Sequence, residues 1–394
     1  MSNYIEYNDK IAFHPGYYIN EVIEESGLTQ YDFAKRLDTT PKNISCLVNG
    51  EQSLSVDIAM KLSRMLDTSV EYWLNLQTAY DTVTAEIKSD KALLEERKIF
   101  NYLDYKYFQT NFALPPLPRK KDLQIEQVRK FLNVSTLSVF KDRNMTVNFR
   151  SCTAELTESN IVKANIMVQI ATNQALKKPA PKFDRNKLND AIKYALTLTS
   201  EHQNFYPLIY EAFFDAGVNF IILPNLTGSK INGATKKIKN NIMLLVNDRR
   251  LNADTFWFTL FHEIGHIVHG DFGITFDGKN CHAEDAADIF AENMLIPLDA
   301  YQKFLSEHGH AITVQNISHF ANQINRDPGI VLGRLLNDGH IDYRDERFKT
   351  LQKKYKICTK VNDSVNSFAQ ILKSPCSGGI QSIYSYDSSA ISFR

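Results

Sequence analysis

The stretch FTLFHEIGHIVHG, Phe258 to Gly270, holds three histidines at helical spacing and decides how the C-terminal half of the chain is interpreted. Apolar residues recur through it every three or four positions, so we expect one helix over about residues 254–269, with Gly270 as its stop. His262 and His266 are four residues apart and would project from the same face of that helix, one turn apart. The pattern predicts a helix that presents two imidazoles together.

The motif H-E-x-x-H, His262 to His266, has the composition of a metal site. Two neutral imidazoles at this spacing can take two positions of a tetrahedral zinc ion. Glu263 lies beside the first histidine and is predicted to accept a proton from water and pass it to a leaving amine. Because the chain has ten histidines, the motif also arises by chance, and an exposed polar helix face is the alternative. A third ligand distinguishes the two.

A downstream glutamate is the candidate third ligand. The segment CHAEDAADIFAENMLIP, Cys281 to Pro297, has the apolar spacing of a second helix. Glu284 follows His266 by eighteen residues, enough for a loop and a returning helix, and would complete a His-His-Glu site for Zn2+ with one position left for water. Asp288 is predicted to hydrogen-bond a zinc-bound histidine and fix its tautomer. Ordinary charges on an exposed helix are the alternative for both carboxylates.

Other side chains near the motif compete for roles. Cys281 and His282 are rival ligands, which rank below Glu284 because a cysteine in a loop has no fixed face. His269 is three residues past His266 and therefore points away from the helix face that carries His262 and His266. We expect it at the rim of the site or in contact with a ligand. The group that stabilises the tetrahedral intermediate stays open among five candidates: Tyr301, His308, His310, His319 and His340.

The N-terminal residues, from Gly16 to about Tyr80, have a compact helical pattern. Two short helices, beginning at Thr29 and at Thr40, have the spacing of a helix-turn-helix whose second helix would enter the major groove. Residues 28–76 hold five basic and six acidic residues, a weak electrostatic footprint, so a dimerisation or protein-binding module is the alternative. The side chains predicted to reach operator DNA are Gln30, Thr40, Lys42, Asn43 and Ser45.

Whole-chain composition narrows the class of protein. Lysine and arginine together number 45, as do aspartate and glutamate, so the formal net charge of zero gives no case for bulk attraction to nucleic acid or a membrane surface. The five cysteines are scattered and form no C-x-x-C pair, which argues against a disulfide framework or a structural zinc knuckle. We find no signal-peptide pattern and no membrane-spanning apolar run, so we expect a cytoplasmic protein with no membrane partner.

Changes of pattern along the chain predict an α+β protein in four parts. Residues 1–80 form an all-α bundle, and residues 81–208 a helical middle region with the proline-rich linker NFALPPLPRKKD. Residues 209–355 form a domain with a small sheet before the histidine helix, and residues 356–394 a tail without an assigned role. In the third part we expect GVNFIILPNL and NNIMLLVND as strands, with the polar TGSKINGATKKIKN between them as a hairpin or loop.

Two regions resemble known families. HPGYYINEVIEESGLTQYDFAKRLD and its continuation to YWLNLQ look like the helix-turn-helix domain of HigA-type antitoxins and related lambda-repressor-like regulators, which implies operator binding as a homodimer. FTLFHEIGHIVHG, EDAADIFAENMLIP and FANQINRDPGIVLGRLLNDGHI resemble the ImmA/IrrE metallopeptidases, which implies a zincin-like domain and gives Glu284 the ligand position. Phe261 and Ile296 depart from that family's usual alanine and methionine, away from the chemistry.

Together the resemblances imply a DNA-binding transcriptional regulator fused to a zinc-dependent endopeptidase. Its expected substrate is a helix-turn-helix repressor or antitoxin-like protein, cleaved in stress or mobile-element control. The alternative is a HigA-like antitoxin or regulator whose metal domain senses a ligand or binds a partner without cleaving it. The intact Glu263 favours the enzyme, because a purely structural metal site has no need of that base.

Overall fold

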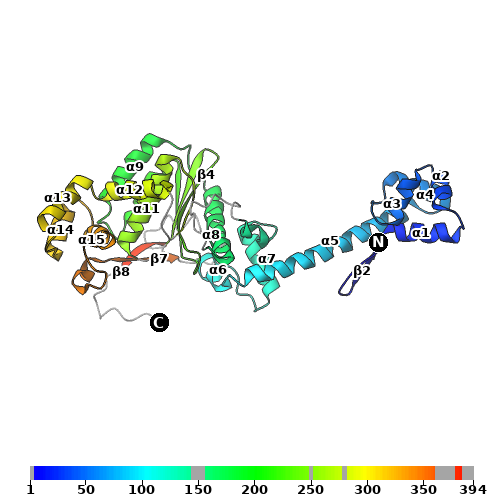
Figure 1. Ribbon diagram of the computed structural model, residues 1–394, viewed down its shortest axis with the longest axis horizontal. Coiled ribbons are helices and arrows are strands. Elements are labelled where there is room, and N and C mark those ends of the chain that lie inside the picture. The colour runs from blue at the N-terminus through cyan, green and yellow to red at the C-terminus, as the bar shows by residue number, and fades with distance from the viewer. Residues whose placement is uncertain (1–3, 143–155, 248–251, 277–281, 360–377, 384–394) are drawn as a thin grey trace. The chain divides into compact units, whose positions relative to one another are not determined.

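The computed structural model describes residues 4–142, 156–247, 252–276, 282–359 and 378–383. The chain divides into two compact units, Met1–Arg97 and Lys98–Arg394. Unit 1 is helical apart from one short hairpin, and unit 2 combines helices with a four-stranded sheet. The predicted α+β fold is therefore confirmed (Figure 1).

Unit 1 contains a hairpin followed by helices, of which α2 and α3 are the two predicted for the helix-turn-helix. Thr29 and Thr40 cap them, because their side chains accept the backbone N–H groups of Asp32 and Asn43. The elements are β1 (Tyr4–Tyr7), β2 (Lys10–Phe13), α1 (Pro15–Glu25), α2 (Gln30–Arg36), α3 (Pro41–Val48), α4 (Val56–Leu66) and α5 (Val70–Phe100).

Helix α5 is one continuous helix of 31 residues. It contains no glycine or proline, so nothing in its sequence interrupts it. The predicted boundary at residue 80 lies inside this helix, whereas the division between compact units falls after Arg97. Helix α5 therefore begins in unit 1, and its last residues belong to unit 2.

Unit 2 begins with helices, then forms the sheet around the histidine helix, and continues with further helices. Its elements are α6 (Tyr105–Phe112), α7 (Lys121–Leu132), the 3-10 helix η1 (Leu137–Lys141), α8 (Glu158–Lys177), α9 (Arg185–Thr197), α10 (Phe205–Asp215), β3 (Val218–Leu223), β4 (Ile231–Ile238), β5 (Asn241–Asn247), α11 (Ala253–His269), β6 (Gly273–Phe276), α12 (His282–Leu295), α13 (Leu298–His308), α14 (Val314–Gln323), α15 (Pro328–Asn337), the 3-10 helix η2 (Glu346–Leu351), β7 (Lys354–Thr359) and β8 (Gly378–Ile383).

The four-stranded sheet has the strand order β3-β5-β4-β6. Strands β3 and β5 are the two apolar strands that the sequence predicts, and they pair in parallel. The segment between them, expected as a hairpin or loop, contains the full strand β4, which pairs antiparallel with both β5 and β6. Its two lysines and its glycine are not typical of a strand, so the sequence pattern does not predict one. The strand forms because its backbone N–H and C=O groups are hydrogen-bonded to β5 on one side and to β6 on the other.

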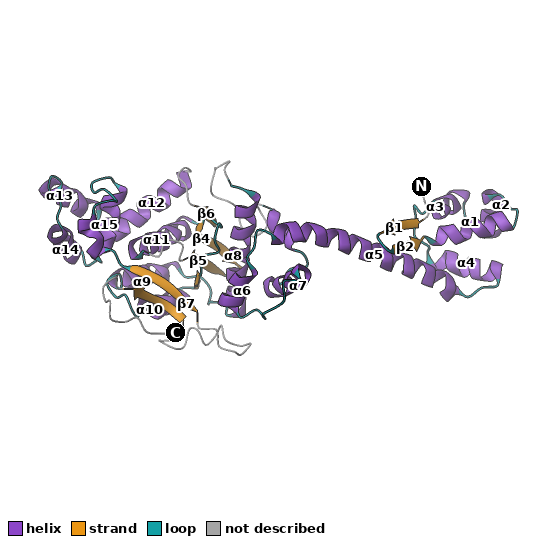
Figure 2. Cartoon of the chain, turned by 90° about the horizontal axis from the view of Figure 1, so that it is seen from below, coloured by secondary structure: helices purple, strands orange, loops and turns teal. Residues whose placement is uncertain are grey.

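Helices cover both faces of this sheet. Helix α11 packs against β4 and β5, and α8 packs against β3 and β5 from the opposite side (Figures 1 and 2). Every residue of β5 is buried, as expected for a strand with both faces covered. Helix α12 lies along α11, and this pair carries the predicted metal site.

The C-terminal part of unit 2 returns to the histidine helix. Strand β7 pairs antiparallel with β8, so part of the predicted tail of residues 356–394 joins a two-stranded sheet. The backbone N–H of Ala253 donates to the carbonyl of Lys353 at 2.9 Å, next to an isolated bridge between Asn252 and Lys354. Among the described residues, no helix is long and apolar enough to cross a membrane.

Candidate metal centre and nucleic-acid interface

Helix α11 places the H-E-x-x-H motif in the interior of unit 2. It ends at Gly270, which adopts a left-handed conformation with φ of 76°, as the sequence predicts. His262 is 6% exposed, His266 is 1% exposed and Glu263 is fully buried. The motif therefore does not lie on a solvated helix face, which removes the alternative interpretation of its polar residues.

Gly265, in the middle of the motif, lets α12 approach α11 closely. A Cβ atom at this position would lie 3.2 Å from the Cα of Ala287 and 3.1 Å from the ring of Phe290. Because the two backbones are so near, the side chain of Glu284 in the first turn of α12 reaches the imidazoles of α11. The glycine of H-E-x-G-H is thus a packing residue, and its neighbours supply the chemistry.

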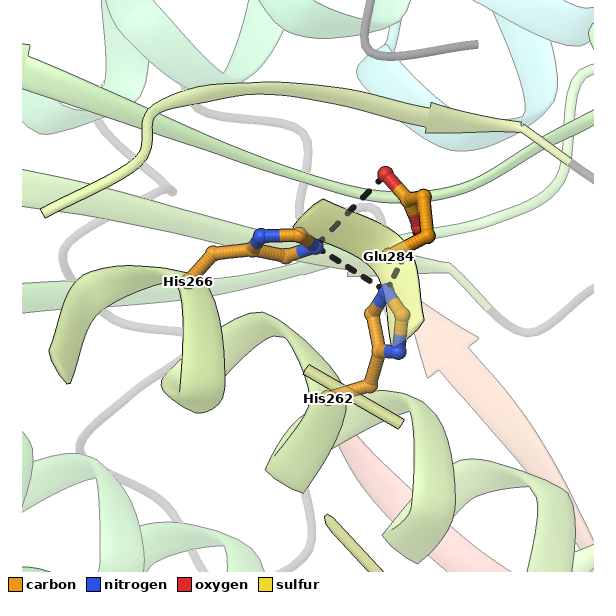
Figure 3. A group of neighbouring side chains, drawn as sticks. All are labelled: His262, His266 and Glu284. Carbon is orange, nitrogen blue, oxygen red and sulfur yellow. Dashed lines mark hydrogen bonds and ion pairs between the residues drawn. The ribbon is translucent and has the colours of Figure 1, made fainter. Parts of the chain in front are cut away.

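The side chains of His262, His266 and Glu284 converge on one point (Figure 3). The Nε2 atoms of the two histidines are 3.0 Å apart, and Glu284 Oε2 is 3.0 Å from His262 Nε2. Glu284 Oε1 is 3.7 Å from His266 Nε2. Ligand atoms from all three residues lie within 4.8 Å of one another. The structure thus brings together the three residues predicted from spacing.

Two further carboxylates hold the outer nitrogens of the imidazoles. Asp288 Oδ1 lies 2.7 Å from His262 Nδ1, and Asp271 Oδ2 lies 3.2 Å from His266 Nδ1. An ionised carboxylate only accepts hydrogen bonds, so the Nδ1 of His262 donates to Asp288 and its Nε2 is the nitrogen that faces Glu284. Asp271 lies close to His266 as a charged neighbour, and its Oδ2 accepts no hydrogen bond from the described residues. The Nε2 atoms of both imidazoles therefore face the Glu284 carboxylate, as the ligands of one cation would.

The electrostatics of the group fit a bound cation. Burial lowers the pKa of His262, but its hydrogen bonds with Asp288 and Glu284 outweigh burial and raise that pKa to about 9. Burial raises the pKa of Glu284, but its hydrogen bond with His262 and the nearby imidazole of His266 bring that pKa down to about 2. Oε1 of Glu284 is buried and accepts no hydrogen bond from the described residues. Two nitrogens and a carboxylate oxygen are a donor set that zinc accepts.

Glu263 occupies a space that the sheet leaves for it. Gly233 of β4 lies beside it, where a Cβ atom would come 2.5 Å from Glu263 Oε1. The pairing of β4 with β6 shifts register between Ile231 and Gly233, an irregularity that often adjoins functional sites. Glu263 is adjacent to His262 in sequence and raises the pKa of that imidazole through its charge, so the carboxylate lies close to the group. It remains outside the three converging ligands.

The structure places the remaining predicted residues of this region elsewhere. His269 is exposed, and its Nδ1 donates to the carbonyl of Gly265 at 2.7 Å, so it does not join the converging group. Tyr301 is buried and donates to Asp338 Oδ2 at 2.9 Å. His308 is half-buried, and three other candidates for the tetrahedral intermediate are exposed: His310, His319 and His340. Cys281 and the side chain of His282 lie outside the described residues.

Two residues of the site, Asp271 and Gly233, are not evident from the sequence. Asp271 comes directly after Gly270, the residue that ends α11. The only signal in the sequence is this position, because a chain that leaves the helix there can turn back toward His266. Gly233 lies in a segment expected to be a loop, so nothing marked it as a neighbour of Glu263. Both contacts depend on how the chain folds back on α11.

In unit 1 the predicted DNA contacts surround the start of α3. Gln30, Thr40 and Lys42 are exposed, and Asn43 and Ser45 are half-buried. The hydroxyl oxygen of Thr40 caps α3, so its remaining capacity is to donate a hydrogen bond. Lys42 is the predicted contact that carries a positive charge.

Asn43 is held by its own neighbours. Its side-chain amide donates to Thr39 Oγ1 at 2.9 Å and accepts from Gln52 Nε2 at 2.7 Å. Gln52, which was not predicted as a contact, is exposed and fixes the orientation of this amide. The surface of α3 therefore contains a preorganised Thr39–Asn43–Gln52 hydrogen-bond chain.

Comparison with protein families matches both units. A family model described as helix-turn-helix matches residues 19–73, and a model described as IrrE N-terminal-like domain matches residues 217–323. The first match covers α2 and α3, and the second covers the sheet, α11 and α12. The two resemblances seen in the sequence are confirmed.

Individual relatives match the N-terminal region. Virulence-associated protein I of Dichelobacter nodosus is 35% identical over 80 residues, which is 20% of this chain and 74% of the relative. YddM of Escherichia coli K12, an uncharacterised HTH-type transcriptional regulator, is 34% identical over 87 residues, 22% of this chain and 93% of the relative. A Pseudomonas aeruginosa protein solved in complex with its operator DNA is 30% identical, with a TM-score of 0.20, over 20% of this chain and 88% of that one.

Proposed function

Because the chain belongs to the helix-turn-helix regulators through its N-terminal region and carries an IrrE N-terminal-like domain, we propose that it is a transcriptional regulator with zinc-dependent endopeptidase activity. Unit 1 binds operator DNA, as a homodimer in the cytoplasm. The C-terminal domain cleaves a helix-turn-helix repressor or antitoxin-like protein in stress or mobile-element control.

The observation that carries this proposal is the convergence of His262, His266 and Glu284 beside a buried Glu263. A site that only holds a metal for stability closes its coordination shell with four protein ligands. Among the described residues, three side chains with ligand atoms converge here, and a zinc ion held by these three would keep one position for water or substrate. The adjacent carboxylate is the group that peptide hydrolysis requires in addition.

The residues of the site divide the work between them. His262, His266 and Glu284 would hold zinc. Asp288 accepts the Nδ1 proton of His262 and so keeps that imidazole in the tautomer that binds it, and Asp271 adds a negative charge beside His266. Zinc bound there would polarise the scissile carbonyl and lower the pKa of a water molecule. Glu263 would accept the proton of the attacking water and transfer it to the leaving amine.

The DNA-binding side of the proposal rests on the family match and on α3. The exposed Lys42 would contact a phosphate, and the oriented amide of Asn43 would read a base edge. The near balance of acidic and basic residues in this unit makes such specific contacts more important than general charge.

The test compares the wild-type chain with Glu263→Gln, which keeps the three ligands and the shape of the side chain. Each zinc-loaded protein is incubated with the helix-turn-helix proteins encoded beside its gene, and products are identified by mass spectrometry. We expect one zinc per chain in both proteins and cleavage at least about a hundredfold slower in the variant. Equal cleavage by both would refute Glu263 as the base. A zinc-loaded wild type that binds its promoter but cleaves no neighbour would favour a sensor or partner-binding domain.

A further inference from the structure

A second pocket lies in the part of unit 2 that the sequence left without a function. It has a volume of about 500 Å³ and is lined by Lys163 of α8, by Leu226 and Thr227 in the loop after β3, and by eight residues between the end of α5 and the end of α6: Asn101, Tyr102, Leu103, Asp104, Lys106, Tyr107, Thr110 and Asn111. It shares no lining residue with the histidine–glutamate group. Pockets of roughly 300–1,000 Å³ are the usual size for small-molecule sites.

Hydrogen bonds between distant segments hold the walls of this pocket in place. The Tyr107 hydroxyl donates to the carbonyl of Pro224 at 2.8 Å, which ties α6 to the loop after β3. The Asn160 amide donates to the carbonyl of Gly228 at 2.7 Å, which ties the start of α8 to the same loop. Lys121 donates to the Asn101 side chain at 2.7 Å. The pocket is therefore preformed, so a ligand does not have to order its walls.

The lining combines apolar and polar groups, with Leu103, Leu226 and the rings of Tyr102 and Tyr107 beside amide, hydroxyl and charged side chains. Its charged groups are the ammonium groups of Lys106 and Lys163 and the carboxylate of Asp104. The carboxylate caps α6 by accepting the backbone N–H of Lys106 at 2.9 Å. Neither ammonium group has an ion-pair partner within the described parts of the chain. The pocket thus has two lysines available for an anion.

The position of Lys163 depends on a glycine. Gly228 has a left-handed φ of +83°, and a Cβ atom there would lie 2.9 Å from Lys163 Nζ. The loop therefore leaves space for the ammonium group directly against its backbone. Because Lys163 is half-buried, a counter-ion in the pocket would be screened less by salt than one on an open surface.

We propose that this pocket binds a small organic phosphate monoester. A phosphate monoester carries a charge of about −1.5 to −2 near neutral pH, which matches two ammonium groups, and lysine binds phosphate well as a point charge. The hydroxyls of Thr110 and Thr227 also line the pocket and would donate to phosphate oxygens. The volume exceeds that of a phosphate group alone, so the organic part would lie against Tyr102.

Such a ligand would contact the two residues that directly follow helix α5. Asn101 and Tyr102 follow Phe100, the last residue of that helix, and both line the pocket. The inference is independent of the metal centre, because it rests on different residues and makes no use of peptide hydrolysis.

The experiment measures binding to the full-length protein by isothermal titration calorimetry. The probes are adenosine monophosphate, its parent nucleoside adenosine, inorganic phosphate and the dicarboxylate malate. Lys163→Gln and Lys106→Gln test the pocket, and Lys303→Gln, an exposed lysine of α13, is the matched control. A circular dichroism spectrum identical to wild type shows that each variant is folded.

We expect adenosine monophosphate to bind and adenosine not to bind. We also expect at least about a tenfold loss of affinity in each pocket variant, as for one charged hydrogen bond, and no change in Lys303→Gln. Three results would overturn the proposal: no binding at millimolar monophosphate, the same affinity in folded Lys163→Gln, or tighter binding of malate. Equal affinity for inorganic phosphate would overturn the assignment of an organic ligand.

Discussion

At Gly233 the absence of a single side-chain carbon decides where the Glu263 carboxylate lies. The carboxylate fills the space that a Cβ atom would take, at 2.5 Å from its ideal position. A general base must lie within hydrogen-bond reach of the proton that it accepts, so a shift of about 1 Å is costly. A glycine in a sheet strand thus belongs to the site as a positioning residue.

We predict that Gly233→Ala lowers peptidase activity by about a hundredfold or more without changing zinc content. The added methyl group displaces the Glu263 side chain, because the three atoms nearest to a Cβ at position 233 all belong to Glu263 and none belongs to a ligand residue. Cleavage rates and metal analysis of the same preparations measure both quantities.

A compensating change serves as the control for this variant. Glu263→Asp shortens the side chain and vacates part of the contested space, so in the Gly233→Ala background it should cost less activity than in wild type. Additive losses in the double variant would show that the two positions are not coupled.

Asp288 gives a second prediction at this scale. Its carboxylate accepts the Nδ1 proton of His262 at 2.7 Å and so fixes the nitrogen that faces the metal. We expect Asp288→Asn to weaken zinc binding by about 10- to 100-fold, the usual effect of losing such a partner. Competition with a chromophoric chelator measures the affinity, and Asp299→Asn, an exposed aspartate of α13, should leave it unchanged. Unchanged affinity in Asp288→Asn would contradict the role.

The sequence was sufficient to predict the three converging residues, because helical spacing fixes which side chains share a face. His262 and His266 follow from one helix, and Glu284 from the length of chain needed to return. The positions of Asp271 and Gly233 could not be predicted. Each is near the site only because a loop or a strand folds back on α11, and no local pattern encodes that approach.

Among the elements, α15 and β7 are joined by a buried polar network. Asp327 caps α15 by accepting the N–H of Gly329 at 2.8 Å, and its other oxygen lies 3.0 Å from His202 Nε2. Lys353 pairs with the same oxygen at 3.1 Å. Burial raises the pKa of the Asp327 carboxyl, but the hydrogen bond with His202 and the charge of Lys353 outweigh burial and hold its pKa below its usual value.

We predict that Asp327→Asn destabilises unit 2 by about 3 kcal/mol at neutral pH, since it leaves buried partners unpaired while an asparagine can still cap α15. Because the pKa of Asp327 is depressed in the folded state, its stabilising contribution is full above the unfolded value of about 4 and is lost as pH falls below it. The free energy of unfolding of the variant should therefore decline less than that of wild type in this acidic window.

Denaturant titrations followed by tryptophan fluorescence measure this difference. The chain has two tryptophans, and Trp73→Phe leaves Trp257, which lies 3.3 Å from the Tyr355 hydroxyl at the edge of the same network, as the reporter. If the free energy of unfolding falls with pH in parallel for Trp73→Phe and for Trp73→Phe with Asp327→Asn, the charge of Asp327 does not cause the loss of stability at acidic pH.

Elements with strong periodicity or explicit caps were predictable, and those defined by neighbours were not. Thr29 and Thr40 cap α2 and α3 as expected, and α11 ends at Gly270. Strand β4 contains two lysines and a glycine, and only its ladders with β5 and β6 make it a strand. Helix α5 runs without interruption across residue 80, where we expected the first part of the chain to end.

For the whole molecule, zero formal net charge means that any DNA affinity is local. We predict that Lys42→Ala weakens binding of the full-length chain to DNA by about the same factor for its own promoter and for unrelated DNA sequences. It should reduce the slope of log affinity against log salt by about one, because one phosphate contact is lost. Fluorescence anisotropy at several salt concentrations measures both. Lys303→Ala, in unit 2, should change neither quantity, and an unchanged slope in Lys42→Ala would exclude the phosphate contact.

Under the proposed function, a continuous α5 would tie the number of metal centres at a locus to the number of operators that the protein occupies. One helix leads the chain from unit 1 into unit 2, so each bound copy would bring one centre with it. A repressor on neighbouring DNA would then meet that centre at a local concentration set by the tether, on the order of millimolar for short tethers, instead of by its cellular abundance. Selectivity could thus come from genomic address, and the affinity for the scissile segment itself could be weak.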